Sequence, residues 1–122
     1  MKVLVVDDDR GIRNLMSIML ANLGHECVVA ANGLEAVTRF SADRQGFHLV
    51  ITDLEMPLMN GYEAIREIRR IEPGARIVSM SANCIADPPS DTPFLEKPFT
   101  FATLQLCLGL AMAGGQSLRR VS

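Results

Sequence analysis

Several short apolar runs of this chain are followed by residue types that phosphoryl transfer requires. Asp7-Asp8-Asp9 follows the first run, Asp53 the third, Ser81 the fourth, and Glu96-Lys97-Pro98 a weaker fifth. Crowded carboxylates repel one another, and a hard divalent cation, Mg²⁺ (or Mn²⁺), relieves that repulsion. Asp53 is then a nucleophile facing the metal, while Lys97 and Ser81 can donate to phosphoryl oxygens. These residues predict metal-assisted transfer of a phosphoryl group to Asp53.

Each of these residues also has an ordinary structural explanation. An Asp or Ser after a strand is usually a helix cap or a turn residue, and a single Lys is most often a surface residue. Asp9, for which we assign no metal role, is expected to cap the first helix. The functional interpretation is favoured because separate strand ends together provide every group that one reaction needs.

The apolar pattern predicts the elements that bring these residues together. Short runs, mostly of β-branched residues, predict buried strands at 3–6, 27–30, 49–52, 77–80 and 94–95. Between them, apolar residues at helical spacing predict helices, including one over 12–23 and a last one over 101–113. Asn32 with Glu35, and Asn60 with Glu63, are start signals for two more helices. Alternating strands and helices indicate a parallel sheet whose ligands bind at the carboxyl ends of the strands.

Length and composition exclude several classes of protein. The chain has 122 residues, enough for one domain, and a net charge of −2, which gives no basic field for nucleic acid or an anionic membrane. Its three cysteines lack the spacing of a zinc site or of a disulfide framework and are expected to be buried free thiols. The first apolar run ends in acids, unlike a signal peptide, and the apolar stretch 104–113 is too short to span a membrane. We therefore expect a soluble, cytoplasmic protein.

Nearly the whole chain resembles the receiver domains of two-component response regulators, particularly the chemotaxis-regulator type. The matching segments are Val3-Leu-Val-Val-Asp-Asp-Asp-Arg10, Val50-Ile-Thr-Asp-Leu-Glu-Met-Pro57 with Met59-Asn-Gly61, Ser81-Ala82, and Phe94-Leu-Glu-Lys-Pro-Phe99. The resemblance implies an α/β, flavodoxin-like, doubly wound fold of three layers, with a five-stranded parallel sheet in the order 2-1-3-4-5. We expect a receiver domain over residues 1–113 and a C-terminal tail or linker stub over 114–122.

The resemblance also implies a role for each residue of the site. Asp7, Asp8 and Asp53 would hold Mg²⁺ together with the backbone carbonyl of Glu55. Asp53 would accept phosphate from a sensor histidine kinase or a phosphotransfer protein, making this a signalling switch. It would not be an enzyme beyond its own phosphotransfer and dephosphorylation. Ser81 and Lys97 would contact the phosphoryl group, Phe94 would occupy the aromatic switch position, and the Lys97–Pro98 peptide would be cis. Phe94 has an equally good interpretation as an ordinary core residue.

The chain departs from the family pattern between Ser81 and Lys97. Residues 83–93 contain three prolines, which lack a backbone donor and disfavour helix, so the fourth helix is expected to be shortened or missing. At most one helical turn is expected near Cys84–Asp87. With that neighbour lost, the last helix, apolar on nearly all sides, would expose apolar surface. This predicts a homodimer or a downstream protein partner at the fifth strand and at Phe101, Leu104 and Leu108; alternatively, the proline-rich loop folds over the helix.

Three other functions use some of the same parts. A Mg²⁺-dependent aspartyl-phosphate phosphatase resembling the haloacid dehalogenases has its acidic pair late in the chain, whereas here the pair comes first. A flavin binder on the same topology needs a phosphate cradle after the first strand, where Asp7-Asp8-Asp9 would repel phosphate. A receiver without phosphorylation is disfavoured because every chemical residue is present. The sequence leaves open whether the chain stands alone or belongs to a larger regulator, and which kinase and output it serves.

Overall fold

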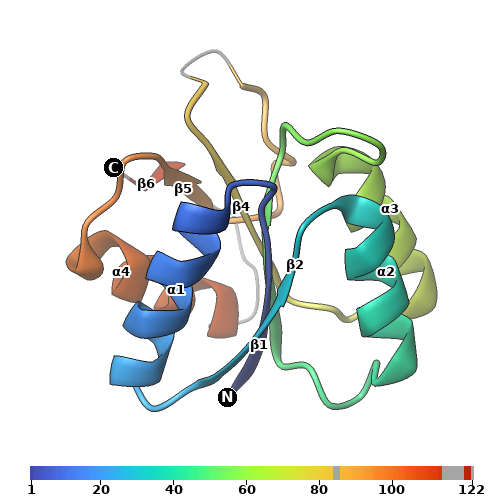
Figure 1. The fold of residues 1–122 in the computed structure, drawn as a ribbon, viewed down its shortest axis with the longest axis horizontal. Helices are drawn as coiled ribbons and strands as arrows, with labels where there is room; N and C mark the ends of the chain where they lie inside the picture. The colour runs from blue at the N-terminus through green and yellow to red at the C-terminus, as the bar shows by residue number, and fades with distance from the viewer. Residues whose placement is uncertain (84–85, 114–119, 122) are drawn as a thin grey trace.

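A central parallel sheet separates two pairs of helices in the computed structural model of the protein, which describes residues 1–83, 86–113 and 120–121 (Figure 1). The strands are β1 (Lys2–Val6), β2 (Glu26–Ala30), β3 (Leu49–Asp53), β4 (Ile77–Ser81), β5 (Phe94–Glu96) and β6 (Arg120–Val121). The helices are α1 (Arg10–Asn22), α2 (Gly33–Ala42), α3 (Gly61–Ile71) and α4 (Phe101–Met112). The order β2-β1-β3-β4-β5 confirms the predicted topology.

Local signals in the sequence account for where the helices begin. Asn60 and Glu63 form a complete capping box at α3, and the Asn32 side chain accepts a hydrogen bond from the Glu35 backbone at α2. Asp9 caps α1 as expected, accepting from the amides of Gly11 and Ile12. These caps fix the loops that follow β1, β2 and β3.

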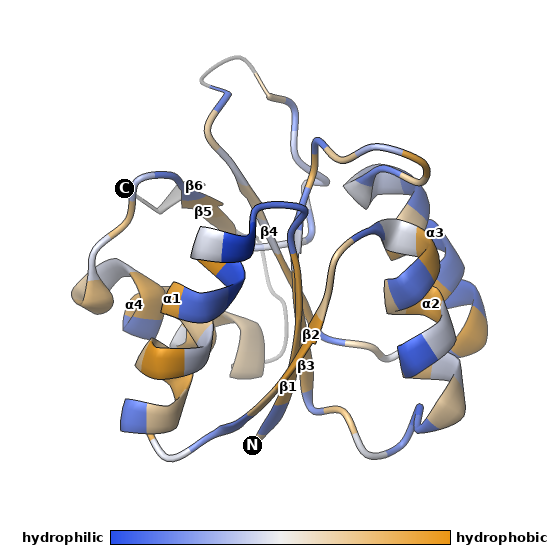
Figure 2. Ribbon diagram, in the orientation of Figure 1, coloured by the Kyte–Doolittle hydropathy of each residue, from blue (hydrophilic) through white to orange (hydrophobic). Residues whose placement is uncertain are grey.

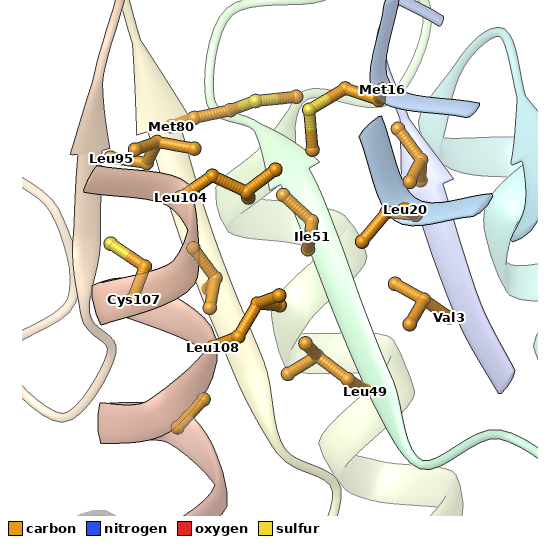
Figure 3. Packing of buried hydrophobic residues seen from close by; sticks show 13 residues of the cluster. Val3, Met16, Leu20, Leu49, Ile51, Met80, Leu95, Leu104, Cys107 and Leu108 are labelled. Carbon is orange, nitrogen blue, oxygen red and sulfur yellow. The ribbon is translucent and has the colours of Figure 1, made fainter. Parts of the chain in front are cut away.

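The two faces of the sheet carry separate cores. Val3, Ile51 and Met80 point to the face covered by α1 and α4, which we call the α1/α4 core (Figure 3). Leu4 and Val50 point to the opposite face with α2 and α3, the α2/α3 core. Because β1 and β3 are buried on both sides, they are hydrophobic along most of their lengths, whereas the loop after β1 is hydrophilic (Figure 2).

The proline-rich segment occupies the place of the missing helix, and its described residues contain no helix. Ala86 is buried in the α2/α3 core, and Asp91 forms a 2.9 Å ion pair with Arg69 of α3. Thr92 and Ser79 of β4 share a buried hydroxyl–hydroxyl hydrogen bond of 2.8 Å. Of the expected turn at 84–87, Cys84 and residue 85 lie outside the described residues. The segment therefore packs on the α3 side of the sheet.

This placement corrects the prediction made for the last helix. Leu104 and Leu108 of α4 are buried in the α1/α4 core, so they are not available to a partner. Where the structure describes the proline-rich segment, at Ala86 and Asp91, it lies on the other face and does not fold over α4. Phe101 is half-buried, and Leu106 is 56% exposed. Only the outer side of α4 remains apolar and accessible.

The backbone of β6 adds a sixth strand that was not predicted. It pairs parallel with β5, Phe94 opposite Arg120 and Leu95 opposite Val121, so β5 is not the edge strand that the sequence led us to expect. The division into a receiver domain at 1–113 and a tail at 114–122 stays a prediction. Within the described residues, no helix combines the length and apolar character that crossing a bilayer would require.

Gly61, the first residue of α3, lies against the end of the strand that finishes at Asp53. A Cβ at Gly61 would lie 2.1 Å from the carbonyl oxygen of Asp53 and 2.7 Å from the Leu54 Cα, both rigid backbone atoms. We predict that Gly61→Ala lowers the free energy of unfolding by about 2 kcal/mol or more, the usual cost of strain in a packed interior. Urea titration measures this change.

Gly109 provides the matched control, since it is exposed in the interior of α4 and its Cβ would meet nothing within 4 Å. Gly109→Ala should stabilise the protein by about 0.5–1 kcal/mol through helix propensity. Equal effects of the two substitutions would contradict the close approach at Gly61.

Candidate functional site

Three carboxylates meet at the carboxyl end of the sheet. Asp7 and Asp8 directly follow β1, and Asp53 is the last residue of the neighbouring strand β3. One carboxylate oxygen from each lies within 4.8 Å of the others. Asp7 and Asp53 are buried, whereas Asp8 is exposed. The parallel pairing of β1 with β3, Val6 opposite Thr52, is what places these acids side by side.

Lys97 brings the positive charge of the site. Its Nζ lies 2.6 Å from Asp7 Oδ2 and 3.3 Å from Asp53 Oδ2. Burial opposes the lysine charge, but the hydrogen bond to Asp7 and the charges of Asp53 and Asp7 outweigh it, so the pKa of Lys97 is raised. The Lys97 backbone N–H also donates to the Ser81 carbonyl at 2.9 Å, and the Lys97–Pro98 peptide is cis.

The environment of Asp53 favours its protonated form. Burial is the largest cause and raises its pKa from 3.8 to about 6, with a further contribution from the charge of Asp7. The charge of Lys97 opposes this rise, as does a 3.4 Å hydrogen bond from the Glu55 backbone to Asp53 Oδ1. Asp53 is therefore a carboxylate whose charge lacks sufficient compensation within the protein.

The donor set fits a hard divalent cation. Its atoms are carboxylate oxygens, the ligands that Mg²⁺ prefers, and the three acids carry formally two more negative charges than Lys97 neutralises. Asp9 stands apart from this set: its side chain caps α1, and its backbone N–H donates to Asp7 Oδ1 at 2.9 Å. Asp7, Asp8 and Asp53 are thus the residues that could hold a metal.

Ser81 lies at the end of β4 and is fully buried. Its hydroxyl donates to Glu55 Oε1 at 2.5 Å and accepts from the Asn83 backbone N–H at 2.9 Å. The sequence did not predict this contact between Ser81 and the Glu55 side chain. The feature of the sequence that could have indicated this contact is an acid two residues after Asp53, where its side chain can reach the end of the neighbouring strand β4.

Phe94 is only 1% exposed and belongs to the α2/α3 core with Phe40 and Ala86. Phe94 thus packs as a core residue in this structure. Its expected role as the aromatic switch stays a prediction.

This chain is similar to known proteins in both sequence and fold. Residues 3–88 match the response regulator receiver domain family. The DNA-binding transcriptional regulator NtrC of Azospirillum brasilense is 46% identical over 66% of this chain and 16% of its own length. The transcriptional regulatory protein ZraR of Klebsiella oxytoca is 32% identical over 91% of this chain and 26% of its own. The chain therefore spans well under two thirds of these curated relatives.

Two solved structures have the same architecture. The response regulator TrrA of Thermotoga maritima, solved in complex with Mg(2+)-BeF, superimposes with a TM-score of 0.78, 32% identity, and coverage of 90% of this chain and 97% of that one. The receiver domain of a Pseudomonas aeruginosa sensor histidine kinase, with a magnesium ion coordinated in the active site cleft, gives a TM-score of 0.81, 29% identity, and coverage of 92% and 97%.

Burial of the Asp53 charge, together with the nearby charge of Asp7, should make a neutral replacement of Asp53 more stable. A carboxyl whose pKa is higher in the folded protein holds its proton more tightly there, so stability falls as pH rises from about 4 through about 6. The rise from 3.8 to about 6 corresponds to an upper limit of roughly 3 kcal/mol. We predict that Asp53→Asn raises the free energy of unfolding by about 1–3 kcal/mol at pH 7.5 without Mg²⁺.

Denaturant titrations at pH 4 and pH 7.5 measure this difference, which should shrink toward zero at the lower pH. Adding Mg²⁺ should stabilise the parent more than the variant, because it neutralises the charge that the variant lacks. A variant less stable than the parent at pH 7.5 without Mg²⁺ would contradict this expectation.

Proposed function

Since the chain belongs to the response regulator receiver domain family, we propose that it is a two-component signalling switch in which Asp53 accepts a phosphoryl group from a sensor histidine kinase or a phosphotransfer protein. The observation that carries this proposal is the cluster of Asp7, Asp8 and Asp53 at the carboxyl end of the sheet, where Lys97 contacts Asp7 and Asp53. A buried, charge-crowded acceptor next to a metal-ligand set and a lysine is suited to that reaction.

Asp7, Asp8 and Asp53 are the proposed Mg²⁺ ligands, with the backbone carbonyl of Glu55 as a further one. Mn²⁺ would suit the same oxygen donors. When bound there, the cation supplies positive charge that orients the incoming phosphoryl group and neutralises its oxygens. The structures of Thermotoga maritima TrrA and of the Pseudomonas aeruginosa receiver domain support this choice of metal.

The transfer itself requires only a positioned nucleophile and compensating charge. A carboxylate oxygen of Asp53 forms a bond to phosphorus, while the bond from phosphorus to the donor's imidazole nitrogen breaks and its electron pair stays with the imidazole. Lys97 already touches Asp53 and can shift its ammonium hydrogen bonds to the phosphoryl oxygens. The hydroxyl of Ser81 provides a neutral donor to the same oxygens.

Phosphorylation would act through the end of β4. It adds negative charge and strong acceptor oxygens at Asp53, which attract Ser81 and the segment behind it. That segment is the proline-rich stretch held to α3 and β4 by Asp91 and Thr92. We therefore propose that the surface over this stretch is the part of the molecule that phosphorylation changes.

Neither nucleic acid nor a membrane is a proposed direct partner, and we propose a cytoplasmic location.

The acceptor can be tested by measuring intact mass after incubation with acetyl phosphate and Mg²⁺. The parent should gain the mass of one phosphoryl group, and the gain should disappear without Mg²⁺ and in Asp53→Asn, which lacks the nucleophilic oxygen. Asp9→Asn is the matched control: Asn caps a helix as well as Asp does, so this variant should still be phosphorylated.

Two results would contradict the proposal. Undiminished phosphorylation of Asp53→Asn would place the acceptor elsewhere. Continuous hydrolysis of a generic phosphate ester by the parent would favour the aspartyl-phosphate phosphatase instead.

A homodimer or a downstream partner at α4 remains a proposal, now confined to the outer side of the helix at Leu106 and Phe101. Burying an exposed leucine contributes about 1.5–3 kcal/mol, so Leu106→Glu should weaken such an association at least about tenfold. Sedimentation of the phosphorylated protein over a range of concentrations measures it. Leu34→Glu, at a similarly exposed leucine on α2, is the control. A parent that stays monomeric at high concentration would contradict the homodimer.

A further inference from the structure

The hydroxyl of Ser81 already donates a hydrogen bond to an acceptor other than a phosphoryl group. It lies in a 2.5 Å hydrogen bond to Glu55 Oε1, within the short range of hydroxyl–carboxylate bonds, which are stronger than bonds between neutral groups. A serine hydroxyl has a single proton to donate. While Ser81 donates to Glu55, it cannot donate to a phosphoryl group on Asp53.

The other contacts of Ser81 fix where its oxygen sits. The Asn83 backbone N–H donates to the same oxygen at 2.9 Å, so Ser81 is held from both sides. Ser81 is fully buried, so water does not offer its hydroxyl another acceptor. The carboxylate of Glu55 is thus what sets the direction of the Ser81 hydroxyl.

The position of Glu55 would allow a phosphoryl group on Asp53 to displace its carboxylate from Ser81. It follows Asp53 by two residues, and its backbone N–H lies 3.4 Å from Asp53 Oδ1, so its side chain shares the neighbourhood of the acceptor. Glu55 is an exposed residue, which means that its carboxylate can turn into water without losing hydration. A negatively charged phosphoryl group arriving at Asp53 would repel it.

From these contacts we infer that Glu55 is a positioning residue that competes with the phosphoryl group for the Ser81 hydroxyl. The inference rests on the proposed function of Asp53 and adds a device that regulates it. Without phosphate, Glu55 accepts the hydrogen bond of the Ser81 hydroxyl and holds the end of β4 in place. With phosphate, the hydroxyl exchanges its carboxylate acceptor for a phosphoryl oxygen. Glu55 therefore stabilises the unphosphorylated state.

The test is a double-mutant cycle on binding of beryllofluoride, a phosphoryl mimic, in the presence of Mg²⁺. The proteins are the parent, Glu55→Ala, Ser81→Ala and the double variant, with dissociation constants from amide chemical shifts. Glu55→Ala should bind about tenfold more tightly than the parent, the factor equivalent to one competing hydrogen bond. In the Ser81→Ala background the same substitution should change binding by less than about twofold, because no hydroxyl is left to compete for.

Two controls separate the hydrogen bond from charge alone. Glu55→Gln keeps an acceptor oxygen without the charge and should give an intermediate gain in binding. Glu96→Ala removes a different acid from the same end of the sheet and should leave binding within about twofold of the parent. A second readout comes from the unliganded protein, where the Asn83 amide signal should shift in Glu55→Ala and not in Glu96→Ala.

Failure of the inference and failure of the proposed function give different results. If the parent binds beryllofluoride and Glu55→Ala tightens binding equally in both backgrounds, Glu55 acts by charge at a distance and the competition is wrong. Unchanged binding in Glu55→Ala would overturn it as well. A parent that does not bind beryllofluoride with Mg²⁺ would overturn the proposed function and this inference together.

Discussion

Mutual repulsion among carboxylates at the end of a buried sheet is the constraint on which this structure depends. Asp7 and Asp53 are held side by side because β1 and β3 pair in parallel, and neither can turn away into water. Lys97 compensates part of the negative charge, but burial, with a smaller contribution from the charge of Asp7, still raises the pKa of Asp53 to about 6. The fold therefore keeps an arrangement that is unfavourable by itself and that becomes favourable when positive charge is added. A site of this kind responds to ions and to phosphoryl groups because its resting state is electrostatically incomplete.

Features that depend on neighbours in the chain were predictable from the sequence. The strands, the helix caps at Asn60 and Asp9, and the strand order follow from periodicity, from short-range hydrogen bonds and from the family resemblance. The meeting of Asp7, Asp8 and Asp53 was predictable for the same reason, since parallel strands bring their ends to one edge.

Features that depend on how segments pack in three dimensions were not predictable. Composition shows that α4 is apolar all round, but it does not show that Leu104 and Leu108 face the sheet while Leu106 faces outward. Nor does it show that the proline-rich segment packs on the α3 side. The bond between Glu55 and Ser81 joins residues 26 positions apart and depends on the direction of one side chain. The pairing of β6 with β5 is also a long-range contact, and no local pattern in the sequence predicts it.

The pairing of β4 with β5 has a consequence for the length of the segment between them. Ser81 lies opposite Glu96, and the Lys97 N–H bonds to the Ser81 carbonyl, so both ends of the intervening segment are fastened to each other. A change in the length of the segment between these anchors alters the entropic cost of closing its ends only slightly. A whole helix has room to disappear there while the chemistry beside it keeps its geometry.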